Sequence, residues 1–386
     1  MNDLYKILVI DLESRNYYVD YIENEINNFY MGGFGLSLYW LSNNPDTIDS
    51  FIISTSAIIN FSNPICKYII MRKDSIGKLV YSSMGGDFSD FLKTNDYDCI
   101  VLLNNASILT DLYIENDNII FHENKMCENH TNSSTYDYLR RTFGNDISSI
   151  YITESALRNN RLARLISDKY RGISKNMANL LAEKNIKSIS VKKSDQRSIK
   201  EVQFNNPNNR CKGCITGCRV IRKNKSRSIF DAKSNYDSSD MARLNMIRAR
   251  IDEYGIDIFS LSKSIEYAYE NLNDVYQITS LDLNSLDYIS KNIVTPDRSE
   301  IYSDLANGVD YLRNKYEKTS LNKKPSRELN DNMKIIDSAG LCLFSVDPND
   351  LDDIRATINR LTDVEYKSED LISLLKRIEK IESSLD

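Results

Sequence analysis

Histidine is the scarcest chemically active residue in this sequence. The chain has two histidines in 386 residues, His122 and His130, and both lie in its first half. Zinc sites usually finish with a spaced histidine pair or repeat a C-x₂-C pair. Neither arrangement follows the cysteines of this chain. The common zinc-finger patterns are therefore absent.

Long apolar runs and a strong excess of one charge are also missing. No stretch is long and apolar enough to span a bilayer, and the N-terminal run at residues 7–10 is too short for a signal peptide. The formal net charge of -6, with acidic and basic residues intermixed, disfavours nucleic-acid binding. These absences predict a soluble protein in the cytoplasm, where clustered cysteines bind metals more often than they form disulfides.

The spacing of the cysteines is the feature of the sequence that points most specifically to a function. Three of the seven cysteines, Cys211, Cys214 and Cys218, form a C-x₂-C-x₃-C run that places three thiolates on one turn. A cubane iron–sulfur cluster needs four thiolates, often three close together and one distant. Cys342 lies far downstream and is the candidate for the fourth. We predict a [4Fe-4S] cluster, with a structural zinc site as the alternative.

The order of patterns along the chain predicts an α+β fold. Strand patterns occur near residues 5–12, 17–22, 51–55, 67–71, 78–82, 98–103, 111–115, 118–122, 150–153 and 186–191. Several alternate polar and apolar residues, as in sheets with one solvated face. Helical spacing occurs after Gly32 and at 87–93, 155–184, 241–254, 259–271, 283–292, 301–316, 347–360 and 368–383. We expect a loop at 124–136 and find no internal repeat.

This order divides the chain into two parts. Residues 1–195 are predicted to form a β-rich domain, and residues 196–386 a mostly helical region that carries the cysteine run at its start. A polar stretch at 194–209, which contains Pro207, is the expected linker. The metal centre would then lie where the two parts join.

Two similar hexads stand out in the helical region. The first, Asp252–Asp257, reads D-x-x-G-I-D, and the second, Asp337–Cys342, reads D-x-x-G-L-C. In each, the glycine follows a predicted helix and would cap it with a positive φ. The acidic residues beside each glycine could accept hydrogen bonds from the N–H groups of a heterocycle. Two ordinary helix ends are the alternative interpretation.

Together these motifs resemble the tungstopterin-dependent aldehyde ferredoxin oxidoreductase family. The likeness begins with the strand KILVIDL and Gly32-Gly33-Phe34-Gly35-Leu36, and continues through Ser83–Asp98 and residues 183–191. The cysteine run, the two hexads and the closing helix follow in the family's order. The resemblance therefore covers essentially the whole chain.

The resemblance implies a cofactor set and its ligands. A β-rich first domain would sandwich a bis-pterin tungsten (or molybdenum) cofactor, and a [4Fe-4S] cluster held by the four cysteines would pass electrons to ferredoxin. Other residues implied to lie at the site are the pterin contacts Asp252, Asp257 and Asp337, the phosphate-side residues Arg72, Ser83, Gly85 and Gly86, and the metal-side acid Asp237.

The chain also departs from the family pattern. The family's G-P-A-G-E-N turn is Thr153–Asn159 here, and its glycine-rich G-R-G-G-L-G stretch is 171–181, which reads as plain helix. A substituted glycine places a Cβ where backbone would otherwise approach the cofactor. The family's metal-proximal histidine has no counterpart, and the interval between the hexads is short. The sequence therefore argues against the usual bis-pterin geometry while keeping the cluster ligands.

Three hypotheses for the function follow. The first is an aldehyde ferredoxin oxidoreductase-like enzyme that carries out two-electron carbonyl chemistry on a small-molecule substrate, with Asp237 as the acid–base candidate. The second is a pterin-free iron–sulfur paralogue that acts as an electron carrier or partner subunit. A zinc-stabilised scaffold is the third. A basic face at Arg158, Arg161 and Arg164 and a basic loop at 222–227 could meet an acidic redox partner. An ordinary solvated surface is the better explanation of the face and at least as good an explanation of the loop. Homo- and hetero-oligomers are both compatible with the sequence.

Overall fold

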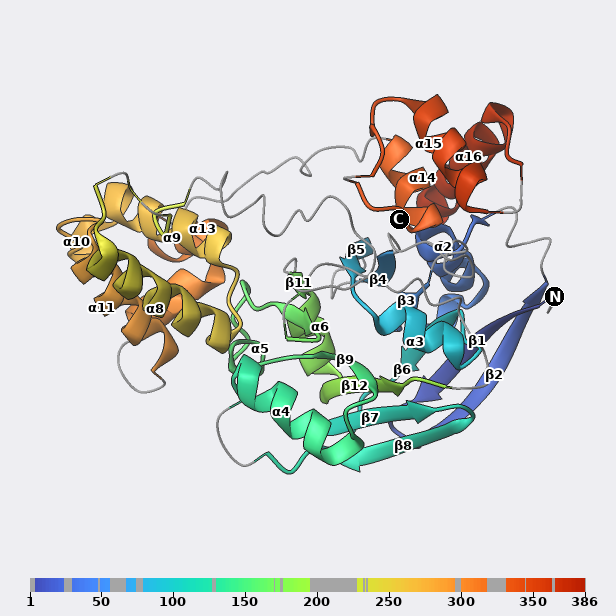
Figure 1. The fold of residues 1–386 in the computed structure, drawn as a ribbon, viewed down its shortest axis with the longest axis horizontal. Helices are drawn as coiled ribbons and strands as arrows, with labels where there is room; N and C mark the ends of the chain where they lie inside the picture. The colour runs from blue at the N-terminus through green and yellow to red at the C-terminus, as the bar shows by residue number, and fades with distance from the viewer. Residues whose placement is uncertain are drawn as a thin grey trace.

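The structure, a computed structural model, has two β-sheets in its first half and helices in its second half (Figure 1). It describes residues 4–23, 30–47, 49–55, 67–73, 79–126, 130–169, 171–173, 176–194, 228–231, 233, 235–295, 300–317, 331–343, 345–362 and 365–385. The α+β prediction is confirmed. The cysteine run and the basic loop at 222–227 lie outside the described residues.

The first sheet and its helices form what we call unit 1. Its strands are ordered β2-β1-β6-β3-β4-β5. In chain order the elements are β1 (Leu4–Asp11), β2 (Asn16–Glu23), α2 (Gly33–Asn43), a 3₁₀ turn (Pro45–Thr47), β3 (Phe51–Ser54), β4 (Lys67–Lys73), β5 (Leu79–Gly85), α3 (Phe88–Thr94) and β6 (Cys99–Leu103).

The second sheet forms unit 2 and repeats the topology of unit 1. Its strand order, read from the β8 edge, is β8-β7-β12-β9-β10-β11, which is the order of unit 1 with six added to each number. Its first and last strands pair in parallel, as do those of unit 1. Its elements are β7 (Thr110–Glu115), β8 (Asn118–Glu123), α4 (Asn132–Phe143), β9 (Ile147–Tyr151), α5 (Glu154–Leu157), β10 (Leu165–Ser167), β11 (Arg171–Ile173), α6 (Met177–Glu183) and β12 (Ile186–Lys192).

The expectation of no internal repeat is therefore wrong at the level of topology. The repeat lies in strand order and backbone pairing, which many sequences can satisfy, so it leaves no matching residue pattern in the sequence.

The central strands of unit 1 are buried on both faces. Along β1, Ile7 and Val9 pack with α2 and the C-terminal helices, whereas Leu8 and Ile10 pack with unit 2. This alternation follows from the two-residue period of a strand. The expected solvated face occurs at the edge strands β2 and β8, which expose alternate or successive side chains.

The long helix expected at 155–184 is wrong. It is divided into α5 and α6 by the two short strands β10 and β11, which extend the second sheet from β9. Strand pairing here overrides a helical pattern, as tertiary context often does. The predicted basic helical face is therefore not formed: Arg158 ends α5, and the Arg161 side chain lies over the Tyr311 ring.

The loop expected at 124–136 is also partly helical, because α4 begins at Asn132. Its N-cap Thr131 and Ser134 form a reciprocal capping box. Serine replaces the usual Glu or Gln in the third helical position of such a box, so the start signal was easy to miss.

The middle helices run from residue 238 to residue 317 and share one apolar core. They are α8 (Ser238–Tyr254), α9 (Ile258–Asn271), α10 (Asn273–Tyr276), α11 (Leu283–Val294), α12 (Glu300–Asp304), a 3₁₀ turn (Leu305–Asn307), α13 (Val309–Leu312) and a π turn (Arg313–Glu317). The single helix expected at 301–316 is broken at Gly308, whose φ is 89°.

The C-terminal helices are α14 (Asp331–Ala339), α15 (Leu351–Leu361) and α16 (Ser368–Leu385). They cover α2 of unit 1 in Figure 1 and share its apolar core, whose members include Ile336, Ile354, Ile378, Trp40 and Leu41. Among the described residues, no helix has the length and apolar character needed to cross a membrane.

Candidate cofactor site

The two hexads dock at corresponding places on the two units. The second hexad spans the C-terminal end of α14 and contacts unit 1. The Gly340 carbonyl accepts a hydrogen bond from the Lys67 N–H at 2.7 Å, at the start of the fourth strand of that unit. The Ser338 hydroxyl accepts one at 3.2 Å from the Gly35 N–H in the first turn of α2.

The first hexad spans the C-terminal end of α8 and contacts unit 2 in the same way. The Gly255 carbonyl accepts a hydrogen bond at 2.8 Å from the Arg164 N–H, directly before β10, the fourth strand of that unit. The Glu253 carboxylate accepts from the Ser133 N–H at 2.8 Å, in the first turn of α4. Each hexad thus satisfies an unpaired helix N–H and adds one backbone bond to the start of a strand. The two hexads therefore occupy equivalent positions on the two repeated units.

Both hexad glycines have the conformation that the sequence predicted. Gly255 has φ 83° and Gly340 has φ 68°, in the left-handed region that glycine allows without strain. Gly255 is also closely covered, since a Cβ there would lie 1.9 Å from the Thr153 Oγ1 atom. In unit 1 the closely covered glycine is Gly33, the first residue of α2. A Cβ there would lie 2.4 Å from the Asp337 carbonyl oxygen of the second hexad.

Several predicted site residues gather at the second hexad. Asp337 is 5% exposed and raises the pKa of the Tyr81 phenol, after the larger effect of that tyrosine's burial. Gly85 pairs with Lys67 across β4 and β5, and Lys67 in turn bonds to Gly340. Ser83 and Gly86 lie in or directly after the same strand. Cys342 is half-buried at the end of the hexad.

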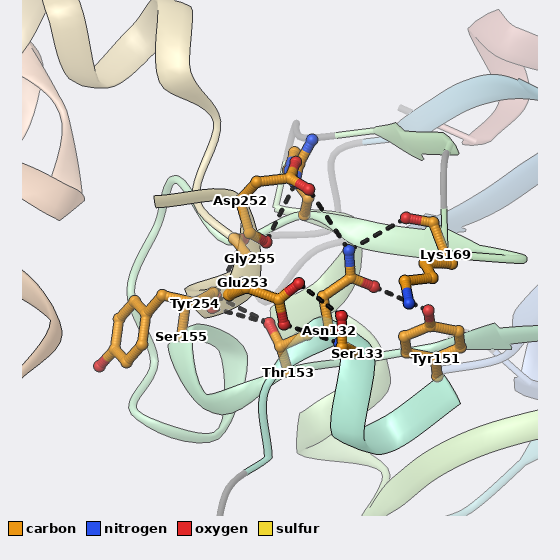
Figure 2. Close-up of polar contacts among 11 residues, drawn as sticks. Asn132, Ser133, Tyr151, Thr153, Ser155, Lys169, Asp252, Glu253, Tyr254 and Gly255 are labelled. Atoms are coloured by element: carbon orange, nitrogen blue, oxygen red, sulfur yellow. Dashed lines mark hydrogen bonds and ion pairs between the residues drawn. The ribbon is translucent and has the colours of Figure 1, made fainter. Parts of the chain in front are cut away.

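The polar groups of the first hexad already have protein partners (Figure 2). The Asp252 carboxylate pairs with the Arg164 guanidinium at 2.5 Å and lies 3.5 Å from the Asn132 amide nitrogen. The Asp257 carboxylate caps α9 by accepting a hydrogen bond from the Ser260 N–H. The Thr153 hydroxyl donates to the Tyr254 carbonyl at 2.9 Å. A pterin at this hexad would have to displace these contacts.

The two hexads therefore differ in how well they fit a pterin. At the second hexad, the buried carboxylate of Asp337 lies near the end of β5, where Gly85 stands. The family resemblance assigns this strand end to the cofactor. At the first, the carboxylates serve an ion pair and a helix cap. The residues present do not fit the paired, two-pterin arrangement that the resemblance implies.

Arg72 lies elsewhere, in a cluster of charges where the two units meet. Its guanidinium donates to Asp49 at 2.6 Å and to Glu183 at 2.9 Å, and its side chain is 8% exposed. The Lys184 ammonium is 3.6 Å from Asp49. Burial lowers the pKa of Lys184 to about 8, against the opposing effect of Asp49. This arrangement gives Arg72 a role in joining α6 of unit 2 to unit 1.

Asp237 is the N-cap of α8 and is exposed. Its carboxylate accepts hydrogen bonds from the Ser239 and Asp240 N–H groups at 2.7 and 2.8 Å. These bonds, led by the Asp240 N–H, hold its pKa below the usual range. The 14 residues of α8 from Ser238 to Ile251 separate it from Asp252, the first residue of the first hexad, by about 22 Å along the helix. Its observed role is to start a helix.

The predicted cluster ligands are only partly placed. Cys211, Cys214 and Cys218 lie outside the described residues, and Cys342 lies inside them. Within the described ranges, no group of three or more His, Cys, Asp or Glu side chains is arranged to hold a metal ion. This search leaves the four-cysteine prediction untested, since three of its members fall outside those ranges.

Sequence reasoning missed the residues that receive the hexads. Thr153, Ser155, Arg164 and Ser133 contact the first hexad, but they are common residue types with no motif of their own. The one available signal was the loss of the family's glycines at 153–159, which we interpreted only as steric conflict. The hydroxyl groups of Thr153 and Ser155 in this stretch make specific hydrogen bonds.

Buried Lys187 in unit 2 was also missed. It is fully buried and donates to the Ile152 carbonyl, and burial lowers its pKa to about 7 despite nearby Asp111 and Glu154. The backbone equivalent in unit 1 is Asp98, because the Asp98 and Lys187 carbonyls accept the same strand-end N–H, from Thr55 and Ile152 respectively. One unit buries an acid where the other buries a base.

Comparison with known proteins places the first half of the chain in a family. Residues 7–193 match the model of the aldehyde ferredoxin oxidoreductase N-terminal domain. A matching solved structure is the active-site complex BamBC of benzoyl coenzyme A reductase with 1,5-dienoyl-CoA. It shares 13% identity with this chain at a TM-score of 0.70, over 99% of this chain and 89% of that chain. At that identity the likeness concerns the fold. No curated protein matches the sequence.

Proposed function

Because this chain is a member of the aldehyde ferredoxin oxidoreductase family, whose N-terminal domain its residues 7–193 form, we propose that it is an oxidoreductase that passes electrons through a [4Fe-4S] cluster to ferredoxin. The chemistry would be two-electron oxidation or reduction of a small carbonyl compound such as an aldehyde. The observation that supports this proposal best is the gathering of Asp337, Gly85 and Cys342 at the second hexad.

Four thiolates would hold the cluster. Cys342 would supply one, which is supported by the docking of its hexad on unit 1 through Gly340 and Ser338. Cys211, Cys214 and Cys218 would supply the others, because a cubane takes four thiolate ligands. Once bound, the cluster would carry one electron at a time. The protein's own part is to hold Cys342 on a backbone segment anchored at both Gly340 and Ser338.

A pterin, if bound, would be held at the second hexad. Asp337 is buried there and would accept hydrogen bonds from a heterocycle. Asp237 is the acid–base candidate supplied by the sequence, and its exposed position at the far end of α8 argues against that role. The paired partners of the first hexad leave the two-pterin scheme without support, so no catalytic step is assigned to it.

A second candidate function is favoured by the first hexad, whose polar groups already have protein partners. A pterin-free iron–sulfur paralogue would need only the cysteine site and would act as an electron carrier or partner subunit. One solved structure with a similar fold is the active-site complex BamBC. A hetero-oligomer with a redox partner is therefore included in this proposal.

Analysis of anaerobically purified protein separates the candidates. The oxidoreductase proposal expects about four iron and four sulfide per chain, together with tungsten or molybdenum and a pterin. Iron and sulfide without tungsten, molybdenum or pterin would exclude the oxidoreductase and favour the pterin-free electron carrier. A colourless protein with one zinc would overturn both candidates and favour a scaffold.

The ligand assignment has its own test. Cys342→Ser should lower the iron content as much as Cys214→Ser does, because a cubane that loses one thiolate is destabilised whichever ligand is removed. Cys127→Ser serves as the control, since Cys127 stands alone in the sequence. Iron at the wild-type level in Cys342→Ser would show that the fourth ligand lies elsewhere.

A further inference from the structure

The middle helices are attached to unit 2 mainly by polar contacts. Their apolar core consists of their own residues together with Phe230, and within the described ranges Leu162 is the unit 2 residue that packs against it. The C-terminal helices, in contrast, share a continuous apolar core with unit 1. Hydrogen bonds must therefore hold the middle helices to unit 2, whereas apolar packing holds the C-terminal helices to unit 1.

Backbone hydrogen bonds supply the first layer of this attachment. The Leu162 carbonyl accepts from the Asp257 N–H at 2.9 Å, and the Leu162 N–H donates to the Ala306 carbonyl at 2.9 Å. Arg164 adds its N–H to the Gly255 carbonyl. These bonds place residues 162–164 of unit 2 alongside the first hexad, where Ala163 and Ile256 form an isolated antiparallel bridge.

Side chains supply the second layer (Figure 2). Thr153 and Ser155 are fully buried, and their hydroxyls donate to the carbonyls of Tyr254 and Gly255 at 2.9 and 3.0 Å. The Ser133 hydroxyl donates to Glu253 at 2.6 Å, and the ion pair of Arg164 with Asp252 completes the set. Every residue of the hexad from Asp252 to Gly255 is thus bonded to unit 2.

These contacts leave no space for a flat ring between the turn at 153–155 and the hexad. A heterocycle between two surfaces needs about 3.5 Å on each side, or roughly 7 Å in all. The hydroxyl and carbonyl oxygens here are 2.9 and 3.0 Å apart. Thr153 also closes the face of Gly255, where a Cβ would lie 1.9 Å from its Oγ1 atom.

We propose that the first hexad is a clamp that fastens the middle helices to unit 2, and that it has replaced a cofactor ligand there. The chain consequently takes up at most one pterin, at the second hexad. The clamp itself does not depend on the proposed redox function, although the statement on pterin number does.

The clamp is tested with Thr153→Val/Ser155→Ala, which removes both hydroxyls and keeps similar volumes. We expect the midpoint of thermal unfolding to fall by about 3–6 °C, since losing two buried hydrogen bonds shifts the midpoint of a large chain by a few degrees. Hydrogen exchange at the Arg164 and Asp257 N–H groups should also become faster, because these amides close the junction.

Ser190→Ala is the matched control, because its buried hydroxyl bonds to Ser149 inside the second sheet at 2.8 Å. It should lower the midpoint without faster exchange at Arg164 or Asp257. Equal exchange at those amides in the clamp variant and in Ser190→Ala would overturn the clamp.

A second arm measures pterin per chain in anaerobically purified wild type, Asp252→Asn and Asp337→Asn. Asp252→Asn should keep the wild-type pterin content and melt at a lower temperature. Two pterins per chain in the wild type, or a loss of pterin in Asp252→Asn as large as in Asp337→Asn, would overturn the proposal. If the wild type holds no pterin, the melting and exchange results alone decide. Iron content, which tests the proposed function, is read separately.

Discussion

Units 1 and 2 have the same strand order and receive a hexad at the same two places, yet they use different chemistry to hold it. In unit 1 the second hexad is set in an apolar core shared with the C-terminal helices, beside buried Asp337. In unit 2 the first hexad is held by hydroxyls and an ion pair. Topology fixes where a segment can add hydrogen bonds, whereas side chains decide what else can bind there.

The units also differ in what their buried polar groups can do. Unit 1 pairs Asp98 with Lys93 inside the fold. Unit 2 places Lys187 at the equivalent position and gives its ammonium the Ile152 carbonyl. A buried charge is costly unless it is paired and hydrogen-bonded. Unit 2 therefore keeps a base that is easily neutralised, and the duplicated fold tolerates both solutions.

The largest expected effect comes from Gly255 and Gly33, the two glycines at which an added Cβ would clash across a hexad contact. Gly255→Ala should lower the free energy of unfolding by about 3 kcal/mol or more, because it combines a positive φ with a clash against buried Thr153. Gly33→Ala should cost a similar amount by displacing Asp337. Chemical denaturation measures both changes.

Iron content distinguishes these two variants. Gly33→Ala should lose iron, because it disturbs the hexad that carries Cys342, and Gly255→Ala should keep it per folded chain. The reverse pattern would show that the cluster belongs to the first hexad and would overturn our assignment of the two units.

Lys187→Met tests the buried base of unit 2. The folded pKa, about 7, lies below the ordinary lysine value of 10.5, so the folded protein binds fewer protons than the unfolded chain between these pH values. The free energy of unfolding of the wild type therefore rises with pH above 7. Lys187 contributes up to about 2 kcal/mol to this rise between pH 7 and 9. Urea denaturation at the two pH values should show a smaller rise in Lys187→Met.

The same experiment has a built-in comparison. Lys184, whose pKa is also lowered, contributes in the same direction in both proteins and cancels in the difference. An identical rise in wild type and Lys187→Met would mean that Lys187 stays protonated in the folded protein.

The side chains that cap the helix starts should have a smaller and equal effect. Glu253→Ala removes the carboxylate that accepts the Ser133 N–H, and Ser338→Ala removes the hydroxyl that accepts the Gly35 N–H. Each should lower the free energy of unfolding by about 1 kcal/mol, the usual value for a lost cap. A cost in one unit and none in the other would show that the two dockings are not equivalent.

Asp237→Asn should have the smallest effect. Asparagine caps helices as well as aspartate does, and Asp237 stands at the opposite end of α8 from the first hexad. Stability and the rate of aldehyde-dependent reduction of ferredoxin should therefore match those of wild type. A rate loss at unchanged stability would restore Asp237 as the acid–base group.

Prediction from sequence succeeded where a residue's role is local. The glycines of both hexads were predicted to cap helices with positive φ, and Gly255 and Gly340 do. The helix at 155–184 failed, because Leu165–Ser167 pairs with β9 and no local pattern reports that partner. Arg72 was assigned to a phosphate by resemblance, and its ion pairs with Asp49 and Glu183 depend on residues distant in sequence.

What the sequence by itself determined is the α+β order of elements, the family, the four candidate cysteines and the glycine at the end of each hexad's helix. The order of elements, the cysteine spacing and the capping glycines follow from hydrophobic period, spacing and backbone freedom, which are properties of short segments. The family comes from the resemblance of the motifs, taken in their order. Only the tertiary structure revealed that the two units are repeats and that one hexad is sealed by Thr153, Ser155 and Arg164. Such contacts join residues about a hundred positions apart, and hydroxyl and carbonyl groups carry no sequence signal for the partner that folding brings to them.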